Sequence, residues 1–277
     1  MIRSWLCCSV LNTNLIEKAQ ESKADVVHFD LEDSVPSTMK NLARNCLKEV
    51  FDLIKFNCQS AVRVNDIQTK EGQADIRFLN NNNIYPDIII LPKRLYTDSF
   101  PELDNFLDSA KKNIKLFSIV ESVEDLVKIK RFEPISSKLK GLILGVADLA
   151  SQYGCSAFEL DTSYIKYDLS VYSKLHNLIL VDSPCFDIHN DKKLVQEAMV
   201  AKSFGFDAKI AIHPDHIPII NEIMIPSSEQ LDFAKEIIFK QNENPEVVIF
   251  QLKNKMIGPP IVNWARKLIS KYGEDHD

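Results

Sequence analysis

The sequence predicts an α/β protein of the (β/α)8 TIM barrel class with a C-terminal helical extension. Short apolar runs rich in β-branched residues alternate with amphipathic stretches along most of the 277 residues, as is typical of βα units around a parallel sheet. Eight such runs are present, whereas six would favour an open doubly wound sheet. We expect the barrel domain over residues 1–242, and an extension over residues 243–277 that packs on the barrel or on a neighbouring subunit.

The predicted elements follow one another in regular order. The apolar runs place strands at 4–10, 26–31, 61–65, 87–91, 115–120, 141–144, 179–182 and 209–212. The amphipathic stretches between them place helices at 14–22, 39–55, 71–80, 102–112, 123–131, 164–177 and 193–204. Cys7 and Cys8 are adjacent on the first strand, so their side chains are expected on opposite faces.

The pattern changes after Ile212, where Pro214, Pro218 and Pro226 indicate a loop and a short helix. Ser227 or Ser228 can cap a helix that runs to about residue 241, before the break at 243–245. An apolar run at 247–250 follows. An amphipathic helix is then expected from the proline pair at 259–260 to residue 271.

The composition excludes several classes of protein. The seven glycines include no G-x-G spacing, which argues against a dinucleotide fingerprint or a phosphate-binding P-loop. A net charge of −6 with scattered basic residues disfavours nucleic-acid binding. The apolar run at 5–11 is too short to span a membrane, and the six cysteines contain no C-x-x-C pair. We therefore expect a cytoplasmic protein with reduced thiols and no membrane partner.

Charged residues follow five successive predicted strands, from the second to the sixth. They include Glu32 and Asp33, Arg63, Lys93, Glu121 and Asp148. The C-terminal ends of barrel strands form the face where such folds build their active sites. An isolated charge at such a position is more often a helix cap or a solvated loop residue, but five together indicate a site. Two carboxylates from adjacent strands suit Mg²⁺, and Arg63 offers a fork for a carboxylate or enolate oxygen.

These residues also carry a family resemblance. The segment Asp30-Leu31-Glu32-Asp33-Ser34-Val35, followed by Lys40 and Ala43-Arg44, resembles the citrate lyase beta-subunit-like branch of the HpcH/HpaI aldolase superfamily. Further motifs match in order over most of the chain: Arg63-Val64-Asn65 with Thr69, Gly72 and Asp75, Leu91-Pro92-Lys93, Glu121, Gly145-x-x-Asp148, Asp182, Gly205-Phe206 and Ile212-His213-Pro214. The ordered series is much more specific than any one triplet.

The resemblance implies a magnesium-dependent carbon–carbon lyase or aldolase, commonly trimeric, that acts on an oxo or β-hydroxy acid or its acyl thioester. The acyl carrier would be coenzyme A or an acyl carrier protein. Glu121 and Asp148 would bind the metal, Arg63 and Glu121 would bind substrate and act in catalysis, and Gly145 and Val146 would also contact substrate. Glu32, Asp33 and Lys93 would orient Arg63 and metal-bound water, although a purely structural ion-pair network is an equal alternative.

Three further residues, His28, His213 and Gly258, affect how the site is interpreted. We expect His28 to be packed in the barrel interior and His213 to hold the loop after the eighth strand. Gly258 in Met256-Ile257-Gly258-Pro259 stands where relatives with thioester chemistry have an aspartate, so an acid–base group is missing. This leaves two alternatives to a lyase: a ligand-binding subunit that keeps the metal with little turnover, and an acyl-thioester hydrolase.

Overall fold

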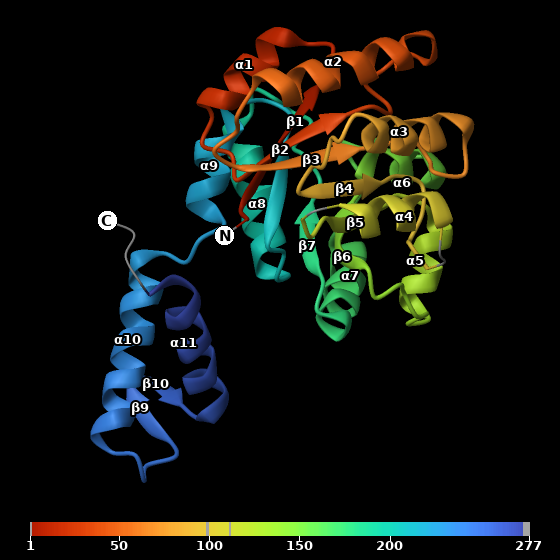
Figure 1. The fold of residues 1–277 in the computed structure, drawn as a ribbon. Coiled ribbons are helices and arrows are strands. Elements are labelled where there is room, and N and C mark those ends of the chain that lie inside the picture. Colours follow the sequence, from red (N-terminus) through yellow and green to blue (C-terminus); the bar gives the residue numbers. More distant parts are fainter. Residues whose placement is uncertain (1, 98–99, 111, 274–277) are drawn as a thin grey trace. The chain divides into compact units, whose positions relative to one another are not determined.

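A computed structural model describes residues 2–97, 100–110 and 112–273, and it divides the chain into two compact units with a boundary between Met224 and Ile225. Among the described residues of the first unit, parallel strands close into an eight-stranded barrel in which each strand pairs with the next and β8 pairs with β1 (Figure 1). The strands are β1 Ser4–Ser9, β2 Val26–Asp30, β3 Gln59–Arg63, β4 Ile88–Leu91, β5 Lys115–Val120, β6 Leu139–Leu144, β7 Ile179–Asp182 and β8 Ala208–Ala211. The predicted (β/α)8 barrel is therefore confirmed.

Helices surround the barrel and connect its strands (Figure 1). They are α1 Thr13–Glu21, the 3-10 helix η1 Ser37–Met39, α2 Lys40–Leu53, α3 Lys70–Asn81, α4 Pro101–Ser109, α5 Val123–Lys130, α6 Val146–Tyr153, α7 Ser163–His176, α8 Asp191–Ser203 and α9 His216–Ile223. Side-chain caps start helices soon after the strands, because Thr69 accepts from the Gly72 amide and Ser122 accepts from the Asp125 amide. Helix α5 consequently starts at Val123, directly after the Ser122 cap and close to the end of β5 at Val120.

Helix α6 was not predicted from the sequence. It begins one residue after Gly145, inside the segment interpreted only as a motif, and it ends at Gly154 with a left-handed φ of 72°. Glycine at this position is a common helix stop signal, and it could have indicated the helix. The helix places Asp148 in its first turn, directly beyond the end of β6.

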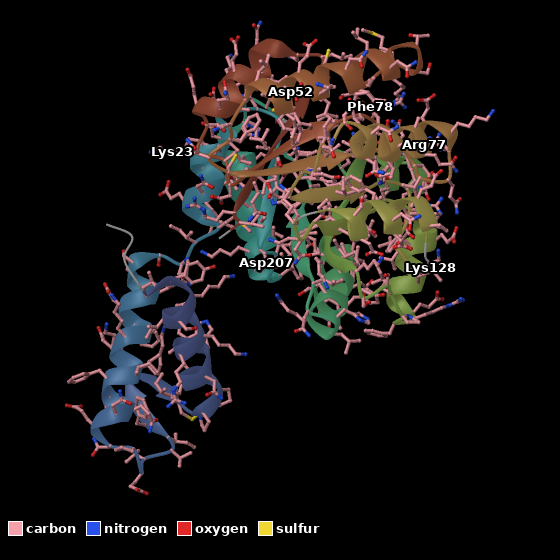
Figure 2. All side chains as sticks on the ribbon, in the orientation of Figure 1. Lys23, Asp52, Arg77, Phe78, Lys128 and Asp207 are labelled. Atoms are coloured by element: carbon pink, nitrogen blue, oxygen red, sulfur yellow. The ribbon has the colours of Figure 1, made fainter. Side chains whose placement is uncertain are left out.

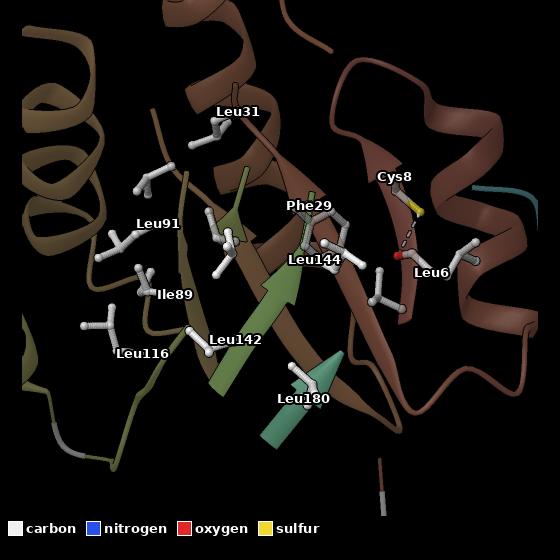
Figure 3. Packing of buried hydrophobic residues seen from close by; sticks show 14 of the residues in the cluster. Leu6, Cys8, Phe29, Leu31, Ile89, Leu91, Leu116, Leu142, Leu144 and Leu180 are labelled. Carbon is white, nitrogen blue, oxygen red and sulfur yellow. Dashed lines mark hydrogen bonds between the residues drawn. The ribbon is translucent and has the colours of Figure 1, made fainter. Parts of the chain in front are cut away.

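The apolar core of the first unit has two layers, because side chains alternate along each strand. Inward-facing residues fill the barrel, where the rings of Trp5 and Phe117 lie 5.1 Å apart. Outward-facing residues pack beneath the helices, and Figure 3 shows part of this layer, including Cys8 and Phe29. Cys7 packs with the inner layer and Cys8 with the outer one, as expected from their adjacency.

The outer surface of the helices carries ion pairs between neighbouring helices and within single helices. Figure 2 shows Arg77 on α3 and Lys128 on α5, which pair with Glu102 and Glu124 at 2.9 Å each. Within the described residues, no helix combines the length and the apolar composition that crossing a membrane would require.

The second unit contains α10 Ser228–Glu243, a hairpin of β9 Phe250–Leu252 and β10 Lys255–Ile257, and α11 Pro259–Tyr272. Ser227 caps α10 as expected, with Gln230 completing a capping box. The unit boundary at 224 lies before the expected one at 242. The reason is that Ala234 and Ile237 of α10 share an apolar cluster with Val262 and Ala265 of α11.

Candidate active site

The mouth at the C-terminal ends of the barrel strands brings together the charged residues that follow the second to the sixth strand. Arg63 ends β3, Glu121 follows β5, and Asp148 lies in the first turn of α6. Glu32 and Asp33 follow β2, and Lys93 follows β4. Glu32 and Glu121 are buried, whereas Asp33, Lys93 and Asp148 reach solvent. The mouth therefore combines a buried carboxylate layer with an exposed rim.

Arg63 is held mainly by Asp30, which is 1% exposed and lies on the neighbouring strand. Its Nε and Nη2 donate to the two carboxylate oxygens of Asp30 at 2.7 Å each. Its Nη1 lies 3.0 Å from Glu32 Oε2 and 3.2 Å from Asp33 Oδ2. Burial raises the pKa of Asp30, but the hydrogen bonds and charge of Arg63 outweigh burial and hold that pKa below its usual value. The guanidinium plane is thus fixed at the rim of the barrel.

Asp30 belonged to the motif that pointed to this site, but it was not assigned a role from the sequence. Its carboxylate also accepts the amides of Glu32 at 2.8 Å and Ser34 at 2.9 Å, so it shapes the turn after β2. Lys40 supports the same turn, because its Nζ donates to the carbonyls of Leu31 and Glu32. An aspartate at an inward position of a strand was the signal that could have identified it.

The Lys93 ammonium lies at the centre of the acidic residues. Its Nζ is 3.4 Å from Asp148 Oδ2, 3.5 Å from Glu32 Oε1, 3.8 Å from Glu121 Oε1 and 3.9 Å from Asp33 Oδ1. Its backbone adopts a left-handed φ of 64°, which costs energy for a residue with a side chain. In that conformation its amide donates to Glu121 Oε1 at 2.6 Å. A cation therefore bridges carboxylates from three strands.

Glu32 and Glu121 carry the most perturbed carboxyl groups at the mouth. Burial raises the pKa of each to about 7, against the opposing charges of Arg63 on Glu32 and of Lys93 on Glu121. The neighbouring carboxylates Asp33 and Asp148 raise these pKa values further. Both groups can consequently exchange a proton near neutral pH, which is the range that acid–base chemistry requires.

Gly145 joins β6 to α6 and touches Glu121 closely. A Cβ atom there would lie 2.6 Å from Glu121 Cβ and 2.8 Å from Ile119 Cγ2, so the contact requires glycine. Glu121 is also fixed through its carbonyl, which accepts from Gln152 Nε2 at 3.1 Å. Gly145 precedes α6 without a side chain to cap it, so a bound anion could accept from the amides of the first turn.

These groups surround a pocket of about 220 Å³ in the barrel mouth. It is lined by Cys7, His28, Asp33, Arg63, Ile119, Glu121, Ile143, Leu144, Gly145, Val146, Ala147, Asp148, Pro184, Phe186, Ile210 and Ile212. Gly145 and Val146, expected to contact substrate, are among them, as is His28, expected in the barrel interior. The volume suits a small organic acid or the acid portion of a larger molecule.

Two of these residues fit a divalent cation. Glu121 Oε1 and Asp148 Oδ2 both lie within 4 Å of the Lys93 ammonium, so the mouth already gathers hard oxygen donors around positive charge. Within the described ranges, no cluster of three or more His, Cys, Asp or Glu side chains has the arrangement of a metal site. A magnesium ion here would take two protein carboxylates and complete its shell with water and substrate, as this ion commonly does.

His213 lies outside this pocket. It lines a separate surface pocket, and its Nδ1 accepts the amide of Asp215 at 3.3 Å and lies 3.6 Å from that residue's carboxylate. These contacts agree with the expected loop-holding role.

A (β/α)8 barrel with carboxylates and an arginine around a pocket at the C-terminal ends of its strands has the architecture of an enzyme. The family model for HpcH/HpaI aldolase/citrate lyase matches residues 3–214, and the chain belongs to this family. Similar proteins include the mitochondrial citramalyl-CoA lyase of Homo sapiens, which is 24% identical in a match that covers 92% of this chain and 81% of the relative.

A (3S)-malyl-CoA thioesterase of Cereibacter sphaeroides is 26% identical over 262 residues, covering 92% of this chain and 89% of the relative. Among solved structures, CitE from Mycobacterium tuberculosis in complex with magnesium, acetoacetate and coenzyme A superposes with a TM-score of 0.80. It is 23% identical, and the match covers 99% of this chain and 98% of that one. This likeness concerns the fold.

Proposed function

We propose that the protein is a magnesium-dependent carbon–carbon lyase that acts on an oxo or β-hydroxy acid or its acyl thioester. The observation that carries this proposal is the convergence of Glu121, Asp148 and Arg63 on one small pocket at the barrel mouth. The same pocket offers oxygen donors for a hard cation and a guanidinium for an anionic substrate. The family and the activities named for its relatives support the same reaction class.

Glu121 and Asp148 would hold the magnesium ion, which supplies Lewis-acid stabilisation of negative charge on a substrate oxygen. Arg63 binds a carboxylate or enolate oxygen of the substrate, and Asp30 keeps its guanidinium plane in position. The first-turn amides of α6, after Gly145, bind a second oxygen of the same acid group. Interactions that strengthen as charge develops on oxygen lower the barrier to bond cleavage.

Cleavage also requires movement of a proton. The hydroxyl of a β-hydroxy acid loses its proton as the carbon–carbon bond breaks, the bond's electron pair forms an enolate, and the enolate carbon then takes up a proton. Gly258 cannot take part in these transfers, because it has no side chain. Glu32 does not line the pocket itself, but its pKa is raised to about 7 and it is hydrogen-bonded to Asp33, which does line the pocket, so it can exchange a proton through Asp33.

The metal assignment is tested by thermal unfolding with and without Mg²⁺. Wild-type protein should be stabilised by the ion because only the folded state presents both carboxylates together. Glu121→Gln should abolish this stabilisation, since a neutral amide replaces the buried carboxylate. A conservative change at the exposed Glu229 of the second unit, Glu229→Gln, is the control and should respond like wild type. Undiminished stabilisation of Glu121→Gln would refute the assignment.

The reaction class is tested by exchange of substrate protons with deuterated water. A lyase must form an enolate, so Mg²⁺ should promote exchange of the methyl protons of an added oxo acid such as pyruvate, observed by NMR. No exchange, together with magnesium-induced stabilisation, would favour the ligand-binding subunit that Gly258 suggests. Screening β-hydroxyacyl thioesters in the same way would identify the substrate class.

A thioester hydrolase is the second candidate activity, because one of the similar proteins is named a malyl-CoA thioesterase. It would use the same pocket with water as the nucleophile. Release of free thiol while the carbon skeleton of a β-hydroxyacyl-CoA stays intact would support it. Cleavage of the skeleton would support the lyase instead.

We also propose that the protein is a homotrimer of the cytoplasm. The second unit exposes apolar side chains that an interface could cover: Val248, Ile249 and Met256 are 61%, 59% and 70% exposed. All six cysteines are unpaired, which favours a reducing compartment. Light scattering of the purified protein should report a mass of three chains, and a monomer would contradict the proposed assembly.

A further inference from the structure

The floor of the pocket contains a polar pair that the proposed mechanism does not use. Cys7 on β1 and His28 on β2 are register partners, and both line the pocket. Two residues earlier, Trp5 and Val26 face the barrel interior, and the alternation of the strands places Cys7 and His28 on the same side. The pair therefore lies inside the barrel, below the charged mouth.

The depth of the pair follows from the geometry of β2. His28 precedes Asp30 by two residues, so it lies about 6–7 Å deeper along the strand than the Asp30–Arg63 pair. Its neighbours in the pocket are largely aliphatic, including Ile119, Ile143 and Ile210. A ligand whose acid group contacts Arg63 would thus reach His28 with the far end of a chain of a few carbon atoms.

His28 is 3% exposed, and both of its ring nitrogens lack a hydrogen-bond partner among the described residues. This contrasts with Asp30, Arg63 and Glu121, each of which has close polar partners. An unpaired buried polar group costs roughly a factor of 5 to 100 in the folding equilibrium. An aliphatic side chain would avoid this cost, so the imidazole indicates a function in binding.

The chemistry of the pair is that of neutral hydrogen-bonding groups. Burial lowers the pKa of His28 to about 3, and the charge of Arg63 lowers it further. One ring nitrogen therefore donates a hydrogen bond while the other accepts one. Burial raises the pKa of Cys7 to about 12, with Asp30 contributing, so its thiol stays protonated and is not a nucleophile.

We propose that His28 is a specificity-determining residue that binds an uncharged hydroxyl group at the far end of the substrate's acid portion. A hydroxyl matches a neutral imidazole because it can accept from one ring nitrogen or donate to the other. A second carboxylate fits poorly, since it would lose its hydration among isoleucines with no cation at that depth. Cys7 contributes a small side chain that leaves room beside the ring. The inference rests on the proposed function, which places the substrate's acid group at Arg63.

The test compares two probes that differ only in the terminal hydroxyl: pentanoate and 5-hydroxypentanoate. Their dissociation constants are measured by calorimetry in the presence of Mg²⁺. Wild-type protein should bind the hydroxylated probe about tenfold more tightly, the effect of one hydrogen bond to a buried group. His28→Leu should lose or reverse this preference, and His28→Asn, which keeps a donor and an acceptor, should retain part of it.

Two controls separate binding from folding. Val26→Ala removes apolar volume one layer below on the same strand, so it should lower the melting temperature while keeping the hydroxyl preference. His28→Leu should melt at or above the wild-type temperature in the absence of ligand, because it removes an unpaired polar group. Marked destabilisation of His28→Leu would indicate a structural role and overturn the proposal.

The outcomes distinguish this inference from the proposed function. An equal preference for the hydroxylated probe in wild type and His28→Leu, or no preference in wild type, would overturn the assignment of His28. Loss of the preference only in His28→Leu supports it. Absence of magnesium-induced stabilisation would contradict the lyase proposal, whereas a His28-dependent preference measured without Mg²⁺ would still support the floor site.

Discussion

Asp30 and Asp33 both contact Arg63, but because only Asp30 is buried, the two contacts contribute differently to the free energy of unfolding. Asp30 is 1% exposed and engages the guanidinium through two bonds of 2.7 Å, whereas the Asp33 side chain is 55% exposed and contributes one at 3.2 Å. Removing one partner of a buried charge pair leaves the other unpaired in a poorly solvated place. Breaking an exposed ion pair costs little stability, because water solvates the charge that remains.

We therefore predict that Asp30→Asn lowers the free energy of unfolding by about 2–5 kcal/mol. Asp33→Asn, the matched control, should lower it by less than about 1 kcal/mol. Urea unfolding of the two variants at neutral pH measures both values. Similar losses in the two variants would mean that burial does not distinguish these contacts.

The raised pKa of Glu121 predicts a dependence of stability on pH. Its pKa in the folded protein is about 7, above its value of about 4.3 in an unfolded chain. The stabilising contribution of a group with a raised pKa is fully present below the unfolded value and is lost as pH rises through the folded value. Without divalent ions, the free energy of unfolding should therefore fall by about 1–3 kcal/mol between about pH 4.5 and about pH 7.

Urea titrations across this pH range, on wild type and on Glu121→Gln, measure the effect. The variant should show a shallower decline because its amide stays neutral, although Glu32 still contributes to the slope. Saturating Mg²⁺ should also reduce the decline in wild type, since it stabilises the ionised carboxylate. Stability that rises through this pH window in wild type would contradict the raised pKa values.

At the scale of elements, the sequence predicted what depends on local pattern and missed what depends on partners. The eight strands were predicted because each is a short apolar run, and the charged residues at their ends were predicted to meet at one mouth. Helix α6 was missed because its eight residues follow β6 directly inside a recognised motif. The hairpin of the second unit was missed because its turn uses Lys253 and Asn254, with φ of 49° and 62°, and contains no glycine.

The two ring nitrogens of His28, which lack hydrogen-bond partners among the described residues, are another feature that local sequence pattern could not predict. Its position on β2 predicted a packed interior residue, and the structure places it in the barrel. Whether its ring finds a hydrogen-bond partner depends on Cys7, Ala61 and the aliphatic residues of other strands, which the chain brings together only in the closed barrel. Sequence periodicity gives a side chain's direction, and it does not give its hydrogen bonds.

The junction of β6 and α6 carries a prediction of its own, because Gly145 and Gly154 lie at opposite ends of the same short helix. Gly145→Ala would place a methyl group 2.6 Å from Glu121 Cβ, so Glu121 or the start of α6 must move. We expect a loss of about 1–3 kcal/mol in the free energy of unfolding and a weaker stabilisation by Mg²⁺. Thermal unfolding with and without the ion measures both effects.

Gly154→Ala is the matched control for this prediction. It is strained because of its φ of 72°, but a Cβ there would meet no atom within 4 Å. It should cost about 1 kcal/mol of stability and leave the response to Mg²⁺ unchanged. An equal loss of the magnesium response in both variants would show that α6 as a whole, and not the contact with Glu121, determines it.

At the scale of the whole molecule, the charged residues of the site lie within one of the two compact units. Arg63, Glu121 and Asp148 all belong to the first unit, which has its own two-layered core. The second unit has a separate apolar cluster around Ala234 and Val262. Each unit thus buries apolar side chains of its own, which is a condition for independent folding.

A chain that ends at Met224 should consequently fold into a barrel and retain stabilisation by Mg²⁺, because it keeps all three of those charged residues. It should also lose the proposed trimeric assembly, since it lacks the exposed apolar side chains of Val248, Ile249 and Met256. Thermal unfolding with and without Mg²⁺, together with light scattering, measures the two properties separately. A truncated barrel that folds and remains trimeric would place the interface on the first unit. A folded barrel that no longer responds to Mg²⁺ would mean that the second unit completes the metal site.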